Sequence, residues 1–582
     1  MELSRSARLL GTLVGFALLW VASPGVATEN GLWPLAVLGV AFWARYASRP
    51  GRWAAGIEWL TGALGWIGLC SWAAYVWEGT LAYIGPAFGL WVIVQGWALR
   101  RFARRLPLAA AAPLAWMMIE TLRGQLEPPF GIQWMRLGTY LHDQSWINGS
   151  ARVWGIGGLS MVLASLGGAL ADLWEWKRPL GGSKSAPGVP WPSLALTLVL
   201  MAGAIWLGRL VPAPVTVDGP RLMLVQPGYE QKRKQESTGS RDMMLEQIEM
   251  TRQGCADAAK AGEAPPDVVV WAETMVRLWI LDTQVDAAVE RGAKLAEWRQ
   301  TDLTASEIEA WRKHEHDWID GMLFGAPPFE GHGALPAGTQ FLAGAEFMTA
   351  TSDALRFKNS ALLWTGPGRE RRGPFSKRHL VPGAETMLGL ERFGWVRERI
   401  FELAKYIPDF VGPAGEEPVL SIQTRDGRTY RCGLSVCFDN AFDDVFTRPA
   451  REHDVDFHVV LSNEAWFEHS QEAHQMVAFS RLEALSTGRS VVRATQSGVS
   501  TVIRPDGSEV ARLRGADGDD RMVRGVLRVV VPVPADGAWS PFEVVDDPAH
   551  PRLATPFVRF ELLWLALWSA APLLLLLMWF KD

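Results

Sequence analysis

The sequence predicts a multi-span α-helical membrane domain joined to a layered α/β domain, and two observations lead to this prediction. Up to about residue 212 the chain is a series of apolar stretches with short connections, and another apolar stretch closes it. Between them, apolar β-branched runs alternate with segments of helical periodicity, which is typical of an α/β domain. We therefore expect a membrane domain over residues 1–212, an α/β domain over 213–558 and a closing span over 559–582.

Eight apolar stretches, with their flanking small and aromatic residues, are candidates to cross a bilayer, for which about 20 residues are needed. Seven precede the α/β domain and one follows it: 9–21, 32–43, 57–77, 81–99, 106–119, 153–173, 194–211 and 562–580. A cleaved signal peptide is the alternative for the first stretch. The other seven stretches would leave an integral membrane protein in either case.

Lysine and arginine in the short loops predict the orientation of these spans. Basic residues precede the first span and gather after the second, fourth and sixth, whereas the loops after the first and third carry none. The loop after the fifth span carries three arginines, which weakens the pattern without reversing it. We therefore expect both termini in the cytoplasm and the α/β domain on the outer side.

The composition argues against other classes of protein. A net charge of −5 over 582 residues predicts no nucleic-acid partner, and four cysteines make a disulfide framework unsuitable. The mean hydropathy of +0.06 is high for a soluble protein, and the 30 tryptophans are typical of anchoring at membrane interfaces. A transporter is disfavoured, because the spans carry few charges and the large outer domain would have no role.

The α/β domain is predicted to contain the following strands and helices. Strands are expected at 221–227, 266–273, 340–347, 359–366, 430–438, 456–464, 490–498 and 526–533, and helices at 241–261 and 471–489. Residues 281–336, rich in charge and then in Gly and Pro, are expected to form an insertion of helix and loop.

Three polar side chains at predicted strand ends, or between strands, form a usable catalytic set. Glu273 ends one buried strand, Cys437 ends another, and Lys377 precedes the second. A thiol needs a base to become a nucleophilic thiolate, and Glu273 can take that proton. Lys377 and the backbone N–H of Phe438 can stabilise the negative charge of a tetrahedral intermediate.

Each member of this set also has a purely structural interpretation. Cysteine is among the most frequently buried residue types, so Cys437 can be a packed core thiol. Glu273 can be a solvated carboxylate, and Lys377 can belong to an ordinary basic loop. The remaining cysteines, Cys70, Cys255 and Cys432, are expected to pack, with Cys432 on the strand face opposite Cys437.

Four segments resemble, in order, the Glu–Lys–Cys signatures of the nitrilase superfamily: "WAET", "KRHLVPGAE", "CFDNAF" and "LSNEAWF". Other segments make the chain similar to one branch, the apolipoprotein N-acyltransferases: "LVQP", "FKNSAL", "RLEALSTGRSVVRATQSGVSTVIRPDG" and, in the membrane part, "WMMIETLRG" and "FGIQWMRLG". The resemblance covers nearly the whole chain except 281–336.

The resemblance implies a nitrilase-like αββα sandwich in which Glu273 is the general base, Lys377 the oxyanion-stabilising lysine and Cys437 the nucleophile. It also implies supporting residues and substrate-pocket residues, which are Glu385, Asp439 and Phe438 for the first group and Trp271, Asn463 and Trp466 for the second. The chain departs from the family pattern at Ala272, Phe438 and Asp439, where the family has Pro, Tyr and Glu.

The reaction implied is a ping-pong acyl transfer at the outer surface of the bacterial inner membrane. Cys437 takes a fatty acyl chain from a membrane phospholipid as a thioester and passes it to the α-amine of a diacylglyceryl-modified lipoprotein. Neither a cofactor nor a metal is expected. The segment 388–410 can direct apolar side chains toward the lipid. The alternatives are a membrane-tethered nitrilase-type amidase, in which water resolves the thioester, and a catalytically idle scaffold.

Overall fold

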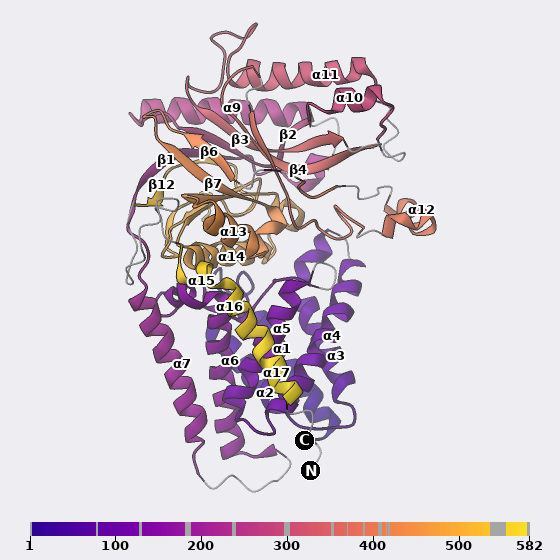
Figure 1. Ribbon diagram of the computed structural model, residues 1–582, viewed down its shortest axis with the longest axis vertical. Coiled ribbons are helices and arrows are strands. Elements are labelled where there is room, and N and C mark those ends of the chain that lie inside the picture. Colours follow the sequence, from indigo (N-terminus) through magenta and orange to yellow (C-terminus); the bar gives the residue numbers. More distant parts are fainter. Residues whose placement is uncertain are drawn as a thin grey trace.

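The computed structural model places a helical bundle under an α/β domain (Figure 1). The structure describes residues 3–76, 79–126, 131–180, 188–235, 240–295, 303–350, 354–368, 371–387, 390–404, 410–414, 416, 419–535 and 554–578. The first helix begins and the last helix ends at the end of the bundle that is remote from the α/β domain.

Seven α-helices precede the α/β domain in the described residues. They are α1 (Arg5–Ala22), α2 (Trp33–Ala47), α3 (Ala54–Leu69), α4 (Gly79–Phe102), α5 (Leu108–Gln125), α6 (Ala151–Lys177) and α7 (Trp191–Leu210). The closing segment is a run of short helices: α15 (Pro556–Arg559), α16 (Glu561–Leu565), the π-helix η11 (Ala566–Ala570) and α17 (Ala571–Met578). Residues 579–580 of the predicted last span lie outside the described residues.

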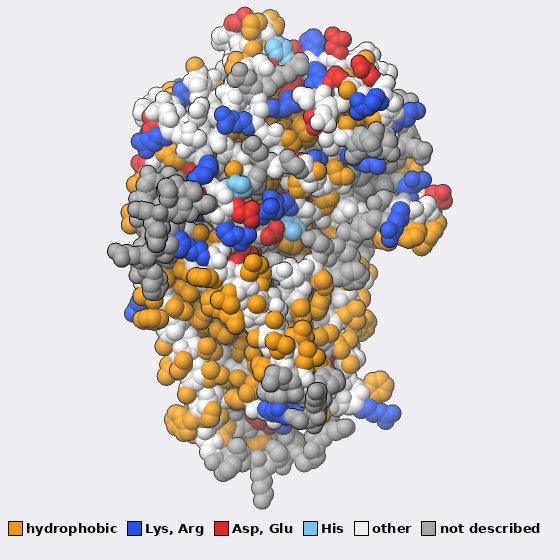
Figure 2. All heavy atoms as spheres, viewed as in Figure 1, with side chains coloured by type: hydrophobic (Ala, Val, Ile, Leu, Met, Phe, Trp, Pro, Cys, Tyr) orange, Lys and Arg blue, Asp and Glu red, His pale blue; other side chains and the backbone are white. Residues whose placement is uncertain are grey.

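The chain is a multi-pass membrane protein. Four helices in the described residues are long and apolar enough to cross a bilayer: Arg5–Ala22, Gly79–Phe102, Asn148–Lys177 and Trp191–Leu210. Hydrophobic side chains cover the surface of the bundle, whereas charged side chains gather on the α/β domain (Figure 2). The total of eight spans stays a prediction, because the other helices are shorter or less apolar.

Ion pairs join the helices at the remote end of the bundle. Glu58 at the start of α3 is fully buried and pairs with Arg100 near the end of α4, with Arg8 of α1 at 3.7 Å. Glu175 near the end of α6 pairs with Arg45 and Arg49 at the end of α2. The buried Glu58 carboxylate is tolerated there because it has two arginine partners.

The α/β domain contains two six-stranded sheets. The first has the order β12-β1-β2-β3-β4-β5 and the second β11-β10-β9-β8-β7-β6. The bounds for the first are β1 (Thr216–Gln226), β2 (Val268–Leu281), β3 (Gln340–Ala350), β4 (Leu355–Trp364), β5 (Arg371–Ser376) and β12 (Gly525–Pro534). Those for the second are β6 (Val419–Gln423), β7 (Thr429–Val436), β8 (Phe457–Ser462), β9 (Ser490–Thr495), β10 (Thr501–Ile503) and β11 (Glu509–Arg512).

The two sheets pack face to face between helices, so the prediction of an αββα sandwich is confirmed. Alternate strand residues such as Leu224, Val270, Leu434 and Val459 fill the core between the sheets. The outer face of the first sheet is covered by α9 (Ser240–Lys260), α10 (Val285–Glu290) and α11 (Ala305–Glu315), and that of the second by α13 (Asp444–Glu452) and α14 (Glu472–Thr487) (Figure 1).

The eight predicted strands and both predicted helices are present, and four strands were missed. The missed strands are the short or outer ones, β5, β6, β10 and β11, which carry little continuous apolar sequence. The predicted insertion begins one residue late in the structure, because β2 extends to Leu281. Within it lie α10, α11 and the π-helix η7 (His316–Leu323).

The helical layer of the second sheet rests directly on the bundle. The indole of Trp134, between α5 and α6, donates to Gln475 of α14 at 2.8 Å, and Gln475 donates to Ser23 at the end of α1 at 2.8 Å. Arg136 makes two hydrogen bonds to Asp443 at 2.7 and 2.5 Å. The strand ends that carry the candidate site therefore lie close to the bundle.

Candidate active site

Glu273 lies inside β2 at an irregularity, not at the end of the strand as predicted. The pairing of β2 with β3 shifts between Trp271 and Val276, and Thr274 adopts a left-handed conformation with φ 49°. Gly344 of β3 faces the irregularity, where a Cβ atom would lie 2.6 Å from the Cα of Glu273. A non-glycine residue held in this region costs about 1 to 3 kcal/mol and is a frequent feature of functional sites.

The irregularity directs the buried Glu273 carboxylate at partners from both sheets. Asn359 of β4 donates its amide to Oε1 at 2.6 Å, and the backbone N–H of Asn463, after β8, donates to Oε2 at 2.8 Å. The ammonium nitrogen of Lys377 lies 3.8 Å from Oε1. Glu273 and Lys377 are thus neighbours in space.

Lys377 follows the last residue of β5 and is almost completely buried. Its Nζ lies 2.9 Å from Oε2 and 3.1 Å from Oε1 of Glu385. Burial lowers the pKa of Lys377, but Cys437, when it is ionised, and the carboxylates of Glu385 and Glu273 outweigh burial and raise this pKa. The lysine therefore remains a cation at neutral pH.

Glu385 completes the charged frame, which is the network of hydrogen bonds and ion pairs among Glu273, Asn359, Lys377 and Glu385. It accepts from the backbone N–H of Val381 at 2.9 Å and from the same Asn359 amide that binds Glu273, at 2.9 Å. Two carboxylates share one amide and face one ammonium group, so their positions are mutually fixed.

Cys437 is the first residue of a 3-10 turn, η9 (Cys437–Ala441), directly after β7. The predicted strand ended on this cysteine, but the strand stops at Val436 and Cys437 has φ 53°. Cys432 does lie on the strand and is buried, so the two cysteines differ because a turn separates them and not by strand alternation alone.

The thiol of Cys437 is half-buried beside the charged frame. Burial and then the negative charge of Glu273 raise the pKa of Cys437 well above its usual value, and Lys377 opposes this shift. The resting state is therefore a thiol, which needs a base before it can act as a nucleophile.

Asp439 ties the cysteine turn to the lysine segment. Its buried carboxylate accepts the backbone N–H of His379 at 2.8 Å, that of Arg378 at 3.2 Å and that of Val436 at 3.3 Å. The short Asp side chain reaches all three donors.

The predicted pocket residues divide into two groups. Asn463 follows β8 and contacts Glu273 through its backbone N–H, and the half-buried Trp466 lies in the next turn, η10 (Glu464–Phe467). Phe438, predicted as a supporting residue, stacks toward Trp134 of the bundle with ring centroids 6.4 Å apart. The structure does not bring Trp271 to the other residues of the site. It is fully buried, donates to Thr251 of α9 at 3.1 Å and packs on Phe341, so it belongs to the core under α9.

Sequence reasoning missed two residues of the site. Asn359 lies in the segment "FKNSAL", where strand alternation places it on the same face as Phe357 and Ala361, so the alternation alone did not mark it as a site residue. Lys234 is buried and donates to the carbonyl oxygen of Glu273 at 3.0 Å. No local pattern distinguishes it from its basic neighbours.

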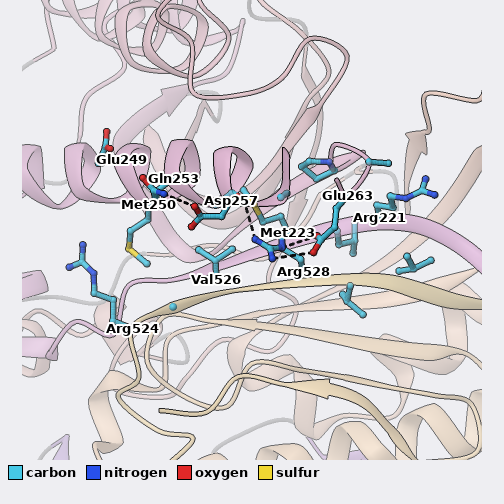
Figure 3. A pocket seen from close by; sticks show the side chains of 18 residues that line it. Arg221, Met223, Glu249, Met250, Gln253, Asp257, Glu263, Arg524, Val526 and Arg528 are labelled. Carbon is cyan, nitrogen blue, oxygen red and sulfur yellow. Dashed lines mark hydrogen bonds and ion pairs between the residues drawn. The ribbon is translucent and has the colours of Figure 1, made fainter. Parts of the chain in front are cut away.

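Two other features of the molecule are not part of this site. An open groove between α9 and β12 is lined by residues such as Arg221, Met250 and Val526 and crossed by an ion pair of Arg528 with Glu263 at 2.9 Å, and it contains none of the catalytic candidates (Figure 3). Glu29, His474 and Asp520 have the donor atoms for a metal. However, Arg512 binds both carboxylates, at 2.7 and 3.1 Å, and already supplies the positive charge.

Comparisons with known proteins agree with the two-part architecture. Residues 14–169 match the apolipoprotein N-acyltransferase N-terminal domain, and residues 256–523 match the carbon-nitrogen hydrolase family. The chain is similar to apolipoprotein N-acyltransferases of Methylococcus capsulatus (25% identical, 74% of this chain and 70% of the relative), Ralstonia nicotianae (26%, 81% and 76%) and Rhizobium meliloti (24%, 82% and 79%).

Proposed function

Because the chain belongs to the apolipoprotein N-acyltransferase family, we propose that it moves a fatty acyl chain from a membrane phospholipid, through a thioester on Cys437, to the α-amine of a diacylglyceryl-modified lipoprotein. The observation that carries the proposal is the position of Lys377, 3.8 Å from Glu273 and 2.9 Å from Glu385, in a frame that Asp439 ties to the turn holding Cys437.

In the first half-reaction, Glu273 accepts the proton of the Cys437 thiol, and the thiolate attacks the ester carbonyl of the phospholipid. The Lys377 ammonium group and the N–H of Phe438 stabilise the oxyanion of the tetrahedral intermediate. The carbon–oxygen bond then breaks, and the leaving alkoxide takes the proton from Glu273. The products are an acyl-cysteine and a lysophospholipid.

In the second half-reaction, the lipoprotein amine attacks the thioester carbonyl. The same oxyanion donors act, and Glu273 takes a proton from the attacking nitrogen. Collapse of the intermediate forms an amide and releases the Cys437 thiolate, which recovers its proton from Glu273. One carboxylate thus serves both halves as base and then acid.

The membrane placement in this proposal follows the charge distribution. Arginines at the remote end of the bundle (Arg8, Arg45, Arg49 and Arg100) fit a cytoplasmic side, which puts both termini in the cytoplasm and residues 213–558 outside the inner membrane. Residues 1–212 and 559–582 are assigned to the membrane.

Helix α12 (Gly394–Ala404) and the preceding turn expose Leu390, Phe393 and Trp395, the last at 74%. Residues 388–389 and 405–409 of the predicted lipid-facing segment lie outside the described residues.

Mass spectrometry of the purified protein tests the proposal. After incubation with phospholipid, we expect one added fatty acyl mass on Cys437, and this mass should move to the amine of a diacylglyceryl-cysteine peptide when the peptide is added. Cys437→Ala should carry no acyl group, whereas Cys432→Ala, the matched control, should still be acylated. An unmodified Cys437 would contradict the proposal.

The same experiment distinguishes acyl transfer from the amidase alternative, with which the carbon-nitrogen hydrolase match is also compatible. If water resolves the thioester, the acyl mass disappears from Cys437 as free fatty acid at the same rate with and without the acceptor peptide. Acyl transfer requires the loss to depend on the peptide concentration. A catalytically idle scaffold would never acquire the acyl mass.

A further inference from the structure

Lys234, in the short helix α8 (Gln231–Gln235), reaches the backbone of the candidate base. The side chain is 4% exposed. Its Nζ donates to the carbonyl oxygen of Glu273 at 3.0 Å and to the hydroxyl of Thr274 at 2.7 Å. Burying a lysine is costly unless its hydrogen bonds are satisfied, and these two acceptors help to satisfy them.

The two acceptors lie at the irregularity of β2. The shift in pairing between Trp271 and Val276 interrupts the regular ladder with β3 at Glu273 and Thr274, and Lys234 binds the carbonyl of the first residue and the hydroxyl of the second. Thr274 is β-branched and has φ 49°, a conformation that L-residues rarely adopt. The ammonium group therefore holds the strained residue by its side chain and the preceding residue by its carbonyl.

The surroundings of Lys234 include charges from several elements. Arg277 of β2 donates to the backbone carbonyl of Lys234 at 2.8 Å. The charges of Glu273, of Cys437 when it is ionised and of Glu346 in β3 act to raise the pKa of Lys234. Burial and then Arg277 lower the pKa of Lys234 to about 7. Neutral lysine still donates hydrogen bonds, so the contacts survive deprotonation in a weaker form.

We infer that Lys234 is a positioning residue for the acyl transfer: its amino group fixes the Glu273–Thr274 backbone and so keeps the Glu273 carboxylate directed at Asn359 and Lys377. It touches neither substrate nor the reacting sulfur. The inference rests on the proposed function, because it assigns Lys234 a role through the proposed base.

Lys234→Met tests the inference, since it keeps the length of the side chain and removes the donor. The expected result is a loss of about 10- to 100-fold in the rate of Cys437 acylation by phospholipid, because small misplacements of catalytic groups have effects of this size. The phospholipid concentration that gives half of the maximal acylation rate should not change. Arg233→Met is the matched control, because Arg233 lies on the same helix but pairs with the partly exposed Glu246. A wild-type rate in Lys234→Met would overturn the inference.

A second pair of variants separates positioning from general stability. Glycine adopts a positive φ without strain, so the Glu273–Thr274 turn should depend less on Lys234 in a Thr274→Gly background. We expect Lys234→Met to reduce the acylation rate by a smaller factor in that background, and Lys234→Arg to retain more activity than Lys234→Met. Equal losses in both backgrounds would overturn the positioning role. Lys234→Leu, which also lacks a donor, replaces Lys234→Met if the methionine variant does not fold, which thermal unfolding in detergent reports.

The failure of this inference can be distinguished from that of the proposed function. If Cys437→Ala abolishes acylation and Lys234→Met does not change it, only the role of Lys234 is wrong. If the wild-type protein never carries an acyl group on Cys437, the proposed function itself is wrong.

Discussion

Asn359 joins Glu273 to Glu385: one side-chain amide donates to Oε1 of each carboxylate, at 2.6 and 2.9 Å. The buried carboxylate of Glu273 and the half-buried carboxylate of Glu385 repel one another, and the amide and the Lys377 ammonium group together offset that repulsion. The geometry of Glu273, the proposed base, thus depends on a neutral side chain.

Asn359→Asp should reduce Cys437 acylation by about 10- to 100-fold, because it removes a donor worth about 1.5 to 3 kcal/mol to a charged acceptor and adds a third carboxyl group. The measurement is the single-turnover rate of acyl-cysteine formation. Ser360→Ala, at the neighbouring position, whose hydroxyl contacts that of Ser376 at 2.7 Å, serves as the control. A rate within twofold of the wild type would show that the amide is dispensable.

The pKa of Cys437 should move in opposite directions in two variants. Glu273 raises this pKa and Lys377 lowers it, so Glu273→Gln should allow the thiolate to form at lower pH and Lys377→Met should require higher pH. The pH dependence of Cys437 alkylation by iodoacetamide, followed by peptide mass spectrometry, reports the shift.

Both variants should lose enzymatic acylation although their thiolates respond in opposite ways. Glu273→Gln makes the sulfur easier to ionise but removes the group that returns the proton to the leaving alkoxide. Alkylation profiles that move together, or not at all, would mean that these charges do not act on the sulfur.

The contact between bundle and α/β domain should depend on the Arg136–Asp443 pair, which makes two hydrogen bonds at 2.7 and 2.5 Å. Arg136→Met leaves a largely buried carboxylate without its main partner and should destabilise the protein by about 3 kcal/mol. A lower midpoint of thermal unfolding in detergent checks this.

The double variant Arg136→Met/Asp443→Leu should recover part of that loss, since no charge then remains uncompensated. Asp443→Leu alone provides the third corner of the cycle. If the double variant is less stable than Arg136→Met, the ion pair is not the source of the effect.

Helix α12 and the preceding turn should contribute to the acylation rate only when the lipid substrate lies in a membrane surface. Trp395→Glu replaces a 74% exposed indole with a charge and should lower the acylation rate on phospholipid vesicles several-fold, because apolar area is lost from the interface. The rate with a soluble short-chain ester should stay the same. Arg397→Gln, on the same exposed helix, is the control, and equal losses on both substrates would contradict the interfacial role.

Much of the fold follows from local sequence. The buried central strands, such as β2 and β8, and the helices α9 and α14 could be predicted because their apolar periodicity is set by which residues must leave water. The outer strands β5 and β6 could not, since a partly exposed strand lacks a continuous apolar signal.

The sequence by itself determined that this chain has apolar spans, an α/β domain and one cysteine in a segment typical of nucleophiles, because these depend on residue type and on spacing along the chain. Only the tertiary structure decided that Glu273 lies at a break inside β2, that Trp271 faces the core and that Asn359 and Lys234 contact Glu273. The hydrogen bond between Glu273 and Asn359 joins residues 86 positions apart in the chain. Partners at such a separation are determined by packing, which no local pattern encodes.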